Sequence, residues 1–183
     1  MKIANKQKGA VLLVSLVILL VLTLLAVSGM QGSIMQERMS TAQRDGMFAL
    51  EIAENAMREA EAALDGLSDL SDFGSTTGFY DGTDTTITVP SPFTAGTWSL
   101  DGSGDPDNAV KGTAVNGIDP LFMFEYKGKV TVDSEGQLPR DFSQYAAGPA
   151  EFDYARILVR TSGPSGSSMR LLEGFYVFQP GGL

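Results

Sequence analysis

The clearest pattern in the chain is an uncharged, largely apolar run near its amino terminus. Between residues 10 and 30 the polar side chains are few and small, namely Ser15, Thr23 and Ser28. At ~1.5 Å per helical residue, this run is about long enough to cross the ~30 Å hydrocarbon core of a bilayer. Residues 1–9 carry lysines and no acid, which predicts a cytoplasmic amino terminus and export of the rest of the chain.

The residues alone leave three maturation routes open. In the first, the run is a plain membrane anchor and the chain keeps Met1. In the second, it is a secretory signal peptide, because Ala26-Val27-Ser28 before Gly29 loosely fits a small-x-small cleavage site. The run is, however, at or beyond the usual ~7–15 residues of such a peptide. In the third, the chain is cut between Gly9 and Ala10 and the whole apolar helix is kept.

Residues 31–70 have the period of an amphipathic helix. Small or apolar side chains recur in steps of four and three, which places them on one face. The centre of this face is an alanine seam, formed by Ala49, Ala53, Ala56, Ala60 and Ala63. Such a seam suits a sheet lying closely on the helix, or close helix packing, better than a free coiled coil. We expect the sheet. Gly29 and Gly32 lie in the middle of the helix expected over residues 10–70 and predict a bend, break or local melting there, since glycine costs ~1 kcal/mol per helical position.

The remaining residues, 71–183, predict a β-rich globular head. Apolar alternation and flanking turn residues predict strands over residues 85–89, 121–132, 152–161 and 169–179, with a strand fragment at 98–100. The last two strands flank a Gly/Ser-rich turn and predict a hairpin. No helical period separates the strands, so we expect antiparallel pairing. The predicted fold is α+β, a long amino-terminal helix packed on an antiparallel sheet of about four strands.

Composition narrows the chemistry. The chain of 183 residues has no cysteine and no histidine, which excludes thiol nucleophiles, histidine-based triads and Cys/His zinc sites. Its net charge of -9 argues against nucleic-acid binding, which needs a basic surface. We expect no enzymatic activity and no cofactor. Asp101, Asp105 and Asp107 alternate as in a calcium loop, but Pro106 and Gly112 stand where that loop needs glycine and a bidentate acid, so we expect a solvated loop.

Stretches of the chain resemble a known family. Lys8-Gly9 followed by Ala-Val-Leu-Leu-Val and a long apolar run resembles the leader of type IV pilin-like proteins. Glu37-Arg38-Met39 and residues 48–61, FALEIAENAMREAE, resemble the amino-terminal region of PilX-type minor pilins. This similarity covers roughly residues 8–64. The segments at residues 154–160 and 171–176 resemble, less closely, the carboxy-terminal hairpin of these proteins.

The resemblance implies the pilin fold and pilin maturation. A dedicated membrane aspartyl peptidase would cut after Gly9, the last leader residue, and methylate Ala10, the new amino terminus. The family's usual glutamate at the fifth mature position is absent, because Val14 stands there. In the family that glutamate is thought to neutralise the amino terminus of the subunit above. A carboxylate without a partner is costly in lipid, so Val14 predicts a subunit with no neighbour above it, at or near the fibre tip.

The resemblance also implies a structural function and not an enzymatic one. The chain would be held in the inner membrane, join a minor-pilin complex that primes pilus assembly, and end in the extracellular pilus, supporting twitching motility and adhesion. The expected partners are other minor pilins, the major pilin, the prepilin peptidase, the inner-membrane assembly machinery and a tip adhesin. The expected domains are a leader (1–9), a transmembrane and assembly helix (10–30), an amphipathic helix (31–70) and the head (71–183).

Other classes of protein stay open at the level of the sequence. A minor pseudopilin of a type II secretion system shares the leader and the helix, but the related tip pseudopilin carries a large helical insertion that this chain is too short to hold. A membrane-anchored periplasmic binding protein or enzyme would use the apolar run only as a tether, and the absence of histidine and cysteine argues against the enzyme. A soluble secreted protein would begin after Ser28.

Overall fold

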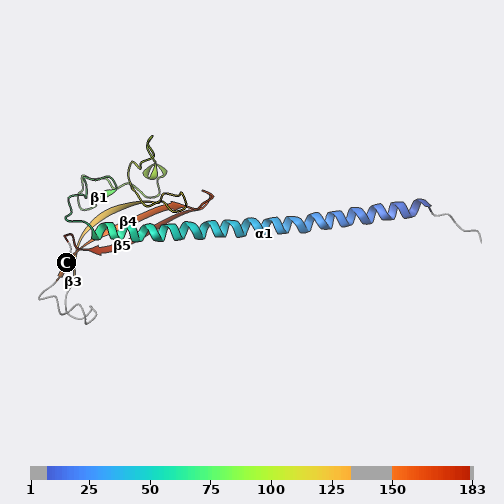
Figure 1. The fold of residues 1–183 in the computed structure, drawn as a ribbon, viewed down its shortest axis with the longest axis horizontal. Coiled ribbons are helices and arrows are strands. Elements are labelled where there is room, and N and C mark those ends of the chain that lie inside the picture. The colour runs from blue at the N-terminus through green and yellow to red at the C-terminus, as the bar shows by residue number, and fades with distance from the viewer. Residues whose placement is uncertain (1–7, 133–149, 182–183) are drawn as a thin grey trace, which may run out of the picture. The chain divides into compact units, whose positions relative to one another are not determined.

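The computed structural model describes residues 8–132 and 150–181. The elements in this part are α1 (Lys8–Asp65), β1 (Phe79–Asp81), the 3₁₀ helix η1 (Ala95–Trp98), β2 (Val110–Lys111), β3 (Leu121–Val132), β4 (Ala150–Ser162) and β5 (Met169–Phe178). The chain divides into two compact units, Met1–Arg44 and Asp45–Leu183, and α1 contributes to both (Figure 1).

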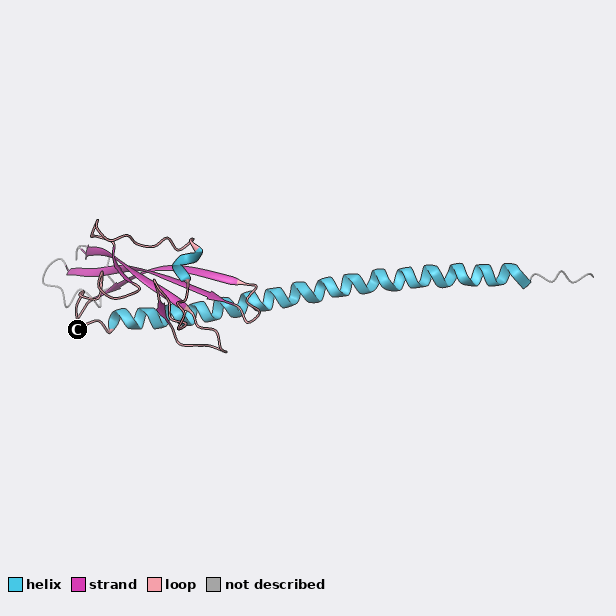
Figure 2. Cartoon of the chain, turned by 90° about the horizontal axis from the view of Figure 1, so that it is seen from above, coloured by secondary structure: helices cyan, strands magenta, loops and turns pink. Residues whose placement is uncertain are grey.

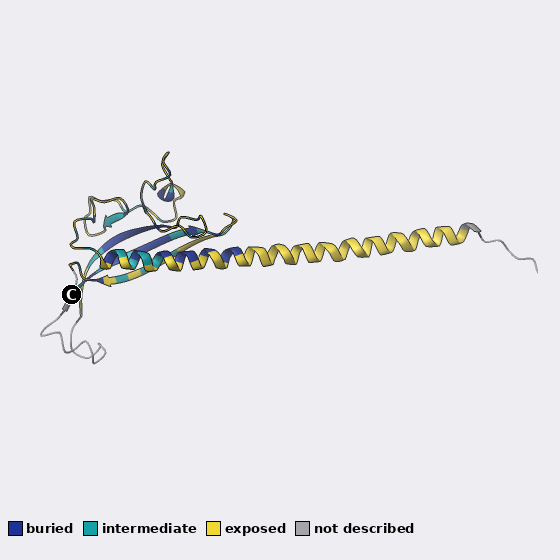
Figure 3. Ribbon diagram, viewed as in Figure 1, coloured by how far each residue is buried: buried dark blue, intermediate teal, exposed yellow. Residues whose placement is uncertain are grey.

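The described part of the first unit is the apolar half of α1. Every side chain from residue 10 to residue 44 is exposed, and this part of the helix is yellow throughout in Figure 3. Its most apolar 18-residue window has a mean hydropathy of 3.2, so by length and composition the helix can cross a membrane. The hydroxyls of Ser15 and Thr23 donate to the carbonyl oxygens of Leu12 and Leu20 at 2.9 and 2.8 Å. Both hydroxyl groups therefore have a hydrogen-bond acceptor without water. Most of the predicted leader, residues 1–7, lies outside the described residues.

Helix α1 continues through Gly29 and Gly32, so the break predicted at these glycines is absent from the described helix. A Cβ at either position would meet nothing within 4 Å, so no neighbouring element holds the helix in a bent form. The ~1 kcal/mol cost of each glycine is small beside the hydrogen bonds of a helix that extends on both sides. Local melting of this stretch in lipid or in a fibre stays a prediction.

The second unit is a sheet packed on the carboxy-terminal part of α1 (Figure 1, Figure 2). The strand order is β1-β3-β4-β5, and β2 pairs with β3. β3 and β4 pair antiparallel with a register shift between Tyr126 and Gly128, and β4 and β5 pair antiparallel without one. The predicted strands at residues 121–132, 152–161 and 169–179 correspond to β3, β4 and β5. The predicted α+β fold is confirmed.

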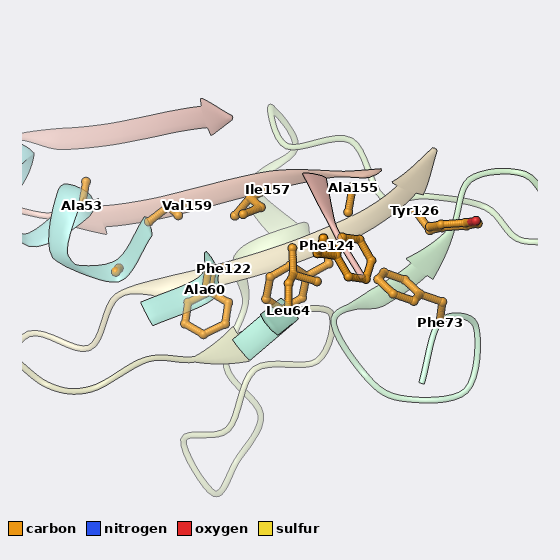
Figure 4. Packing of buried hydrophobic residues seen from close by; sticks show 12 residues of the cluster. Ala53, Ala60, Leu64, Phe73, Phe122, Phe124, Tyr126, Ala155, Ile157 and Val159 are labelled. Atoms are coloured by element: carbon orange, nitrogen blue, oxygen red, sulfur yellow. The ribbon is translucent and has the colours of Figure 1, made fainter. Parts of the chain in front are cut away.

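The main core lies between α1 and the inner face of this sheet (Figure 4). The side chains of the alanine seam are small, and Ala53, Ala56 and Ala60 are almost completely buried. Phe122 and Phe124 of β3 fill the space that these alanines leave, in the close-packed manner of protein interiors. The helix and the sheet therefore fit because one carries small side chains and the other carries large ones.

A second, smaller cluster covers part of the sheet's outer face. Trp98 of η1 packs with Met123 of β3 and Leu158 of β4, and all three are buried. The indole Nε1 of Trp98 donates to the carbonyl oxygen of Pro92 at 2.8 Å, and the Thr97 hydroxyl donates to the Ser91 carbonyl at 2.7 Å. The long connection between β1 and β2 is thus fixed over the sheet.

The predicted strand at residues 85–89 and the fragment at 98–100 are wrong. Asp84 accepts hydrogen bonds from the N–H and the hydroxyl of Thr86 at 2.8 and 2.7 Å, and such local bonds compete with a strand ladder. Trp98 ends η1, and Leu100 forms only an isolated bridge with Pro106. The pairing was also not wholly antiparallel, because β1, which the sequence did not predict, runs parallel to β3.

Helix α1 ends at Asp65 and not at residue 70. The N–H of Leu67 bonds to the carbonyl of Leu64 at 3.2 Å, which closes the helix with a tighter turn. Leu67 and Leu70 nevertheless pack against the main core cluster. Leu67 and Leu70 keep the apolar spacing of the helix because they are packed on the core, although the helix has already ended. The spacing therefore predicted a helix end at residue 70, five residues beyond Asp65.

Candidate functional site

The candidate assembly surface is the exposed apolar part of α1. Val14, at the fifth position after the predicted cut, is 56% exposed, and Ala10 is exposed as well. A shallow hollow on the other side of the same helix is lined by Leu12, Ser15, Leu16, Leu19, Leu20 and Thr23. All six belong to one helix, so lipid chains or another helix must supply the opposite wall. This surface is stable in a membrane or among other helices and is unfavourable in water.

At the start of the second unit, Asp45 fixes the β4–β5 turn to the helix. This residue is 7% exposed, and its Oδ1 and Oδ2 accept the backbone N–H groups of Ser165 and Ser168 at 2.8 and 3.1 Å. A Cβ at Gly163 would lie 2.5 Å from Asp45 Oδ2, so this close approach requires glycine. The hydrogen bonds from Ser165 and Ser168 hold the pKa of Asp45 below its ordinary value of 3.8.

The clamp formed by Asp45 predicts a pH-dependent stability. Because folding lowers the pKa of Asp45, its ionised carboxylate stabilises the folded state fully above pH 3.8. This stabilisation is lost as the pH falls through the lowered pKa of the folded state. We expect Asp45→Asn to lower the midpoint of thermal unfolding at neutral pH and to weaken the fall of that midpoint below pH 3.8. The measurement is thermal unfolding of the full chain in detergent across pH, followed by Trp98 fluorescence. Glu51→Gln, an exposed acid on the same helix, is the control, and equal midpoints for both variants would contradict the clamp.

Glu59 ties the same helix to the loop after β2. Its two carboxylate oxygens accept the backbone N–H of Thr113 at 3.1 and 2.9 Å, and its Oε1 also accepts the Thr113 hydroxyl at 2.8 Å. Glu59 lies outside the alanine seam, on a side of the helix that also carries the exposed acids Glu51 and Glu54. The loop returns to the flank of the helix, where Glu59 serves as its anchor.

Tyr126 and Asp153 form a buried polar pair that joins β3 to β4. The Tyr126 hydroxyl donates to Asp153 Oδ1 at 2.6 Å, and each residue is 9% exposed. Burial, and then the Asp153 carboxylate, raise the pKa of Tyr126 well above its ordinary value. The hydroxyl therefore stays protonated and keeps donating, which suits a structural contact beside the β3 bulge.

An ion network crosses the outer face of the sheet. Arg156 on β4 contacts Glu125 of β3 at 3.1 Å and Glu173 of β5 at 2.8 Å, and Lys127 gives Glu125 a second cation at 2.8 Å. Glu125 is buried, and two cations offset the cost of removing its charge from water. The network links β3, β4 and β5 and therefore stabilises the sheet.

The loop at residues 101–107 uses its acids for its own turn. Oδ1 of Asp101 accepts the N–H groups of Ser103 and Asp105 at 2.7 and 2.9 Å, and Oδ2 of Asp107 accepts the Ser99 hydroxyl at 3.0 Å. Within residues 8–132 and 150–181, no group of three or more acids is placed to hold a metal ion. The local geometry therefore gives the calcium hypothesis no support.

A long helix that is exposed and apolar in its first unit and packed on a mostly antiparallel sheet in its second is a pilin-like α+β architecture. The PilX N-terminal family model matches residues 8–58. The chain thus carries a PilX N-terminal domain, which indicates a type IV minor pilin of the PilX family. This confirms the resemblance of the amino-terminal region, and the resemblance of the carboxy-terminal hairpin stays a prediction. No curated protein and no solved structure matches the chain.

The structure buries the alanine seam that the sequence predicted, with Ala49 completely buried and Ala63 partly buried at its ends. Asp45 is a contact residue that the sequence did not predict. One signal was available, because Asp45 directly precedes the buried part of the seam on the helix. Its partner could not be read from the chain, since Ser165 lies 120 positions away.

Proposed function

We propose that this chain is a structural minor pilin of a type IV pilus, held in the inner membrane before assembly and carried into the pilus afterwards. The observation behind the proposal is that the PilX N-terminal match, residues 8–58, covers the helix whose apolar side chains are exposed. Burial of apolar surface contributes ~25 cal/mol per Å². A helix of this kind can therefore supply association energy among other subunits without any chemistry.

In the proposed maturation, the prepilin peptidase cuts after Gly9 and methylates Ala10. The amino terminus then lies at the cytoplasmic side, and the head lies outside the inner membrane. This order is supported by the position of the apolar run, which begins directly at Ala10 and stays helical in the structure. Such a helix can leave the lipid for the fibre core because both environments are apolar.

In the proposed assembly, the chain joins other minor pilins in a complex that primes the pilus, and the major pilin is added beneath it with the inner-membrane assembly machinery. Val14 supports a place at or near the tip, because a subunit with no neighbour above it has no use for a carboxylate in lipid. The head would then be available to a tip adhesin or to surfaces, which links the chain to twitching motility and adhesion.

Loss of the gene is the direct test of this function. Cells that normally make pili are expected to lose most of their surface filaments when the gene is deleted and to regain them when it is restored. Quantitative mass spectrometry of sheared filaments should find this chain at far lower abundance than the major pilin. Normal numbers of filaments in the deleted strain would overturn the proposal.

The tip position gives a separate prediction for Val14→Glu. We expect the variant to be made and inserted but to shift from the tip toward positions along the filament, because the carboxylate can then neutralise the amino terminus of a subunit above. Immunogold labelling of filaments measures the position, with Val17→Ala as an apolar control in the same helix. Two results would contradict the tip hypothesis. In one, the Val14→Glu variant is still labelled at the tip. In the other, the wild-type chain is itself labelled along the filament.

A further inference from the structure

Strand β5 forms one edge of the sheet. Within the described residues β4 pairs with one side of β5 and no strand pairs with the other. The β4–β5 register is continuous through all ten residues of β5, with no bulge. The strand contains no proline, and its two charged residues are Arg170, near its start, and Glu173, which is paired with Arg156. Natural proteins usually protect long edges by proline, by charged side chains or by bulges, because an open edge offers unpaired N–H and C=O groups to another strand.

Four of the five outward-facing side chains of this edge strand are apolar, and the fifth, Glu173, is paired with Arg156 of β4. Met169, Leu171, Phe175 and Val177 alternate along β5 and are all exposed, with Phe175 at 63% and Val177 at 50%. The inward-facing residues, such as Leu172 and Tyr176, pack against the main core cluster instead. Exposed apolar rows of this kind mark sites of contact with another molecule.

An acidic stripe of α1 runs beside the same edge. Leu50, Glu54, Met57, Glu61 and Asp65 follow one another in steps of four and three, so they share one flank of the helix. Two contacts show that this flank lies along β5. The sulfur of Met57 is 3.4 Å from where a Cβ at Gly174 would be, and Asp65 accepts the Tyr176 hydroxyl at 2.8 Å. Arg58 lies next to this stripe, but its guanidinium donates to Asn55 at 3.4 Å. Within the described residues neither Glu54 nor Glu61 forms a salt bridge.

The charge of this stripe reaches β5. Asp65, burial and the negative charge of Glu61 together raise the pKa of Tyr176 above its ordinary value. Leu50 is 41% exposed, so the stripe also offers apolar surface between its acids. A strand added beside the Phe175–Val177 end of β5 would therefore meet apolar side chains on the outer side of the sheet and acidic side chains on the side of the helix.

We propose that the free edge of β5 binds an extended strand of a partner protein, in which apolar side chains alternate with lysine or arginine. Its backbone would pair with β5, its apolar side chains would extend the row of Phe175 and Val177, and its cations would face Glu54 and Glu61. Strand addition of this kind takes affinity from backbone hydrogen bonds and specificity from alternate side chains. The inference rests on the second unit alone and goes beyond the proposed function.

The test uses the full chain purified in detergent and three synthetic decapeptides. The probe alternates valine and lysine. One control is the same peptide with alternate N-methylated residues, which cannot pair, and the other alternates valine and glutamate. Hydrogen exchange is measured at the β5 amides that point away from β4. At a peptide concentration about ten times its Kd, we expect exchange to slow about tenfold with the valine–lysine peptide. We expect little change with either control.

A variant of the acidic stripe distinguishes specific strand pairing from non-specific binding of the peptide. Glu61→Gln should reduce the preference for the lysine peptide over the glutamate peptide, whereas Glu51→Gln, on a different side of the helix, should not. Equal protection by all three peptides, or none by the first, would overturn the proposal. Slow exchange of these amides before any peptide is added would also overturn it, because the edge would then already be covered by the chain itself or by a second copy.

Discussion

Replacing Phe124 with alanine is expected to lower the free energy of unfolding of the head by about 3–5 kcal/mol. Phe124 is completely buried at the centre of the main core, and its ring lies 4.5 Å from that of Phe79 and 5.4 Å from that of Phe122. The helix opposite presents Ala60, which is too short to fill the cavity left behind. Domains of this size are stable by only ~5–15 kcal/mol, so the variant should lose a large share of the total.

The measurement is denaturant unfolding of the full chain in detergent, followed by the fluorescence of Trp98. This single tryptophan is buried on the outer face of the same sheet, so its emission reports loss of the head's structure. Phe175→Ala is the matched control, because this phenylalanine is 63% exposed and its truncation should change stability by no more than ~0.5 kcal/mol. Similar losses for the two variants would show that the core is not placed as described.

Replacing Gly9 with valine is expected to abolish maturation almost completely. The proposed peptidase cuts after a glycine. Valine adds a β-branched side chain at that position and restricts the backbone, whereas glycine has no side chain and a freely adaptable backbone. The uncut chain keeps the lysines of residues 1–9 ahead of the apolar run, so its helix would have to take these charges into the fibre. We expect the variant to accumulate as the longer form in the membrane and to be absent from sheared filaments.

The control for this prediction is the other candidate cleavage site. Ser28→Leu destroys the small-x-small pattern at residues 26–28 while it keeps the helix apolar. Immunoblots should show the normal mature size for Ser28→Leu and only the longer form for Gly9→Val. The reverse result would mean that the apolar helix is a signal peptide and is removed.

Local pattern was enough to predict the parts of the fold that pack against each other directly. The alternation at Phe122 and Phe124 predicted β3 to its correct ends, and these two side chains face the main core, although residues 121–126 are buried on both faces of the sheet. The alanine period predicted the packed face of α1, since Ala53, Ala56 and Ala60 all meet the sheet. On the helix, the period of small side chains matches the period of burial.

The parts that were missed depend on partners far away in the chain. β1 is three residues long and is a strand only because β3 lies beside it. Residues 85–89 have strand-forming side chains, but the bonds between Asp84 and Thr86 hold them in a turn. The roles of Asp45 and Glu59 appear only when the fold brings Ser165 and Thr113 to them. Polar contacts of this kind leave no period in the sequence.

The central claim is that the apolar helix is retained after maturation. Mass spectrometry of the intact chain isolated from membranes and from sheared filaments tests it most directly, because it gives the first residue of each form. The account predicts that the filament form begins at Ala10 and carries one methyl group on its amino terminus. A filament or exported form that begins at Gly29 would contradict the account, as would one that still begins at Met1.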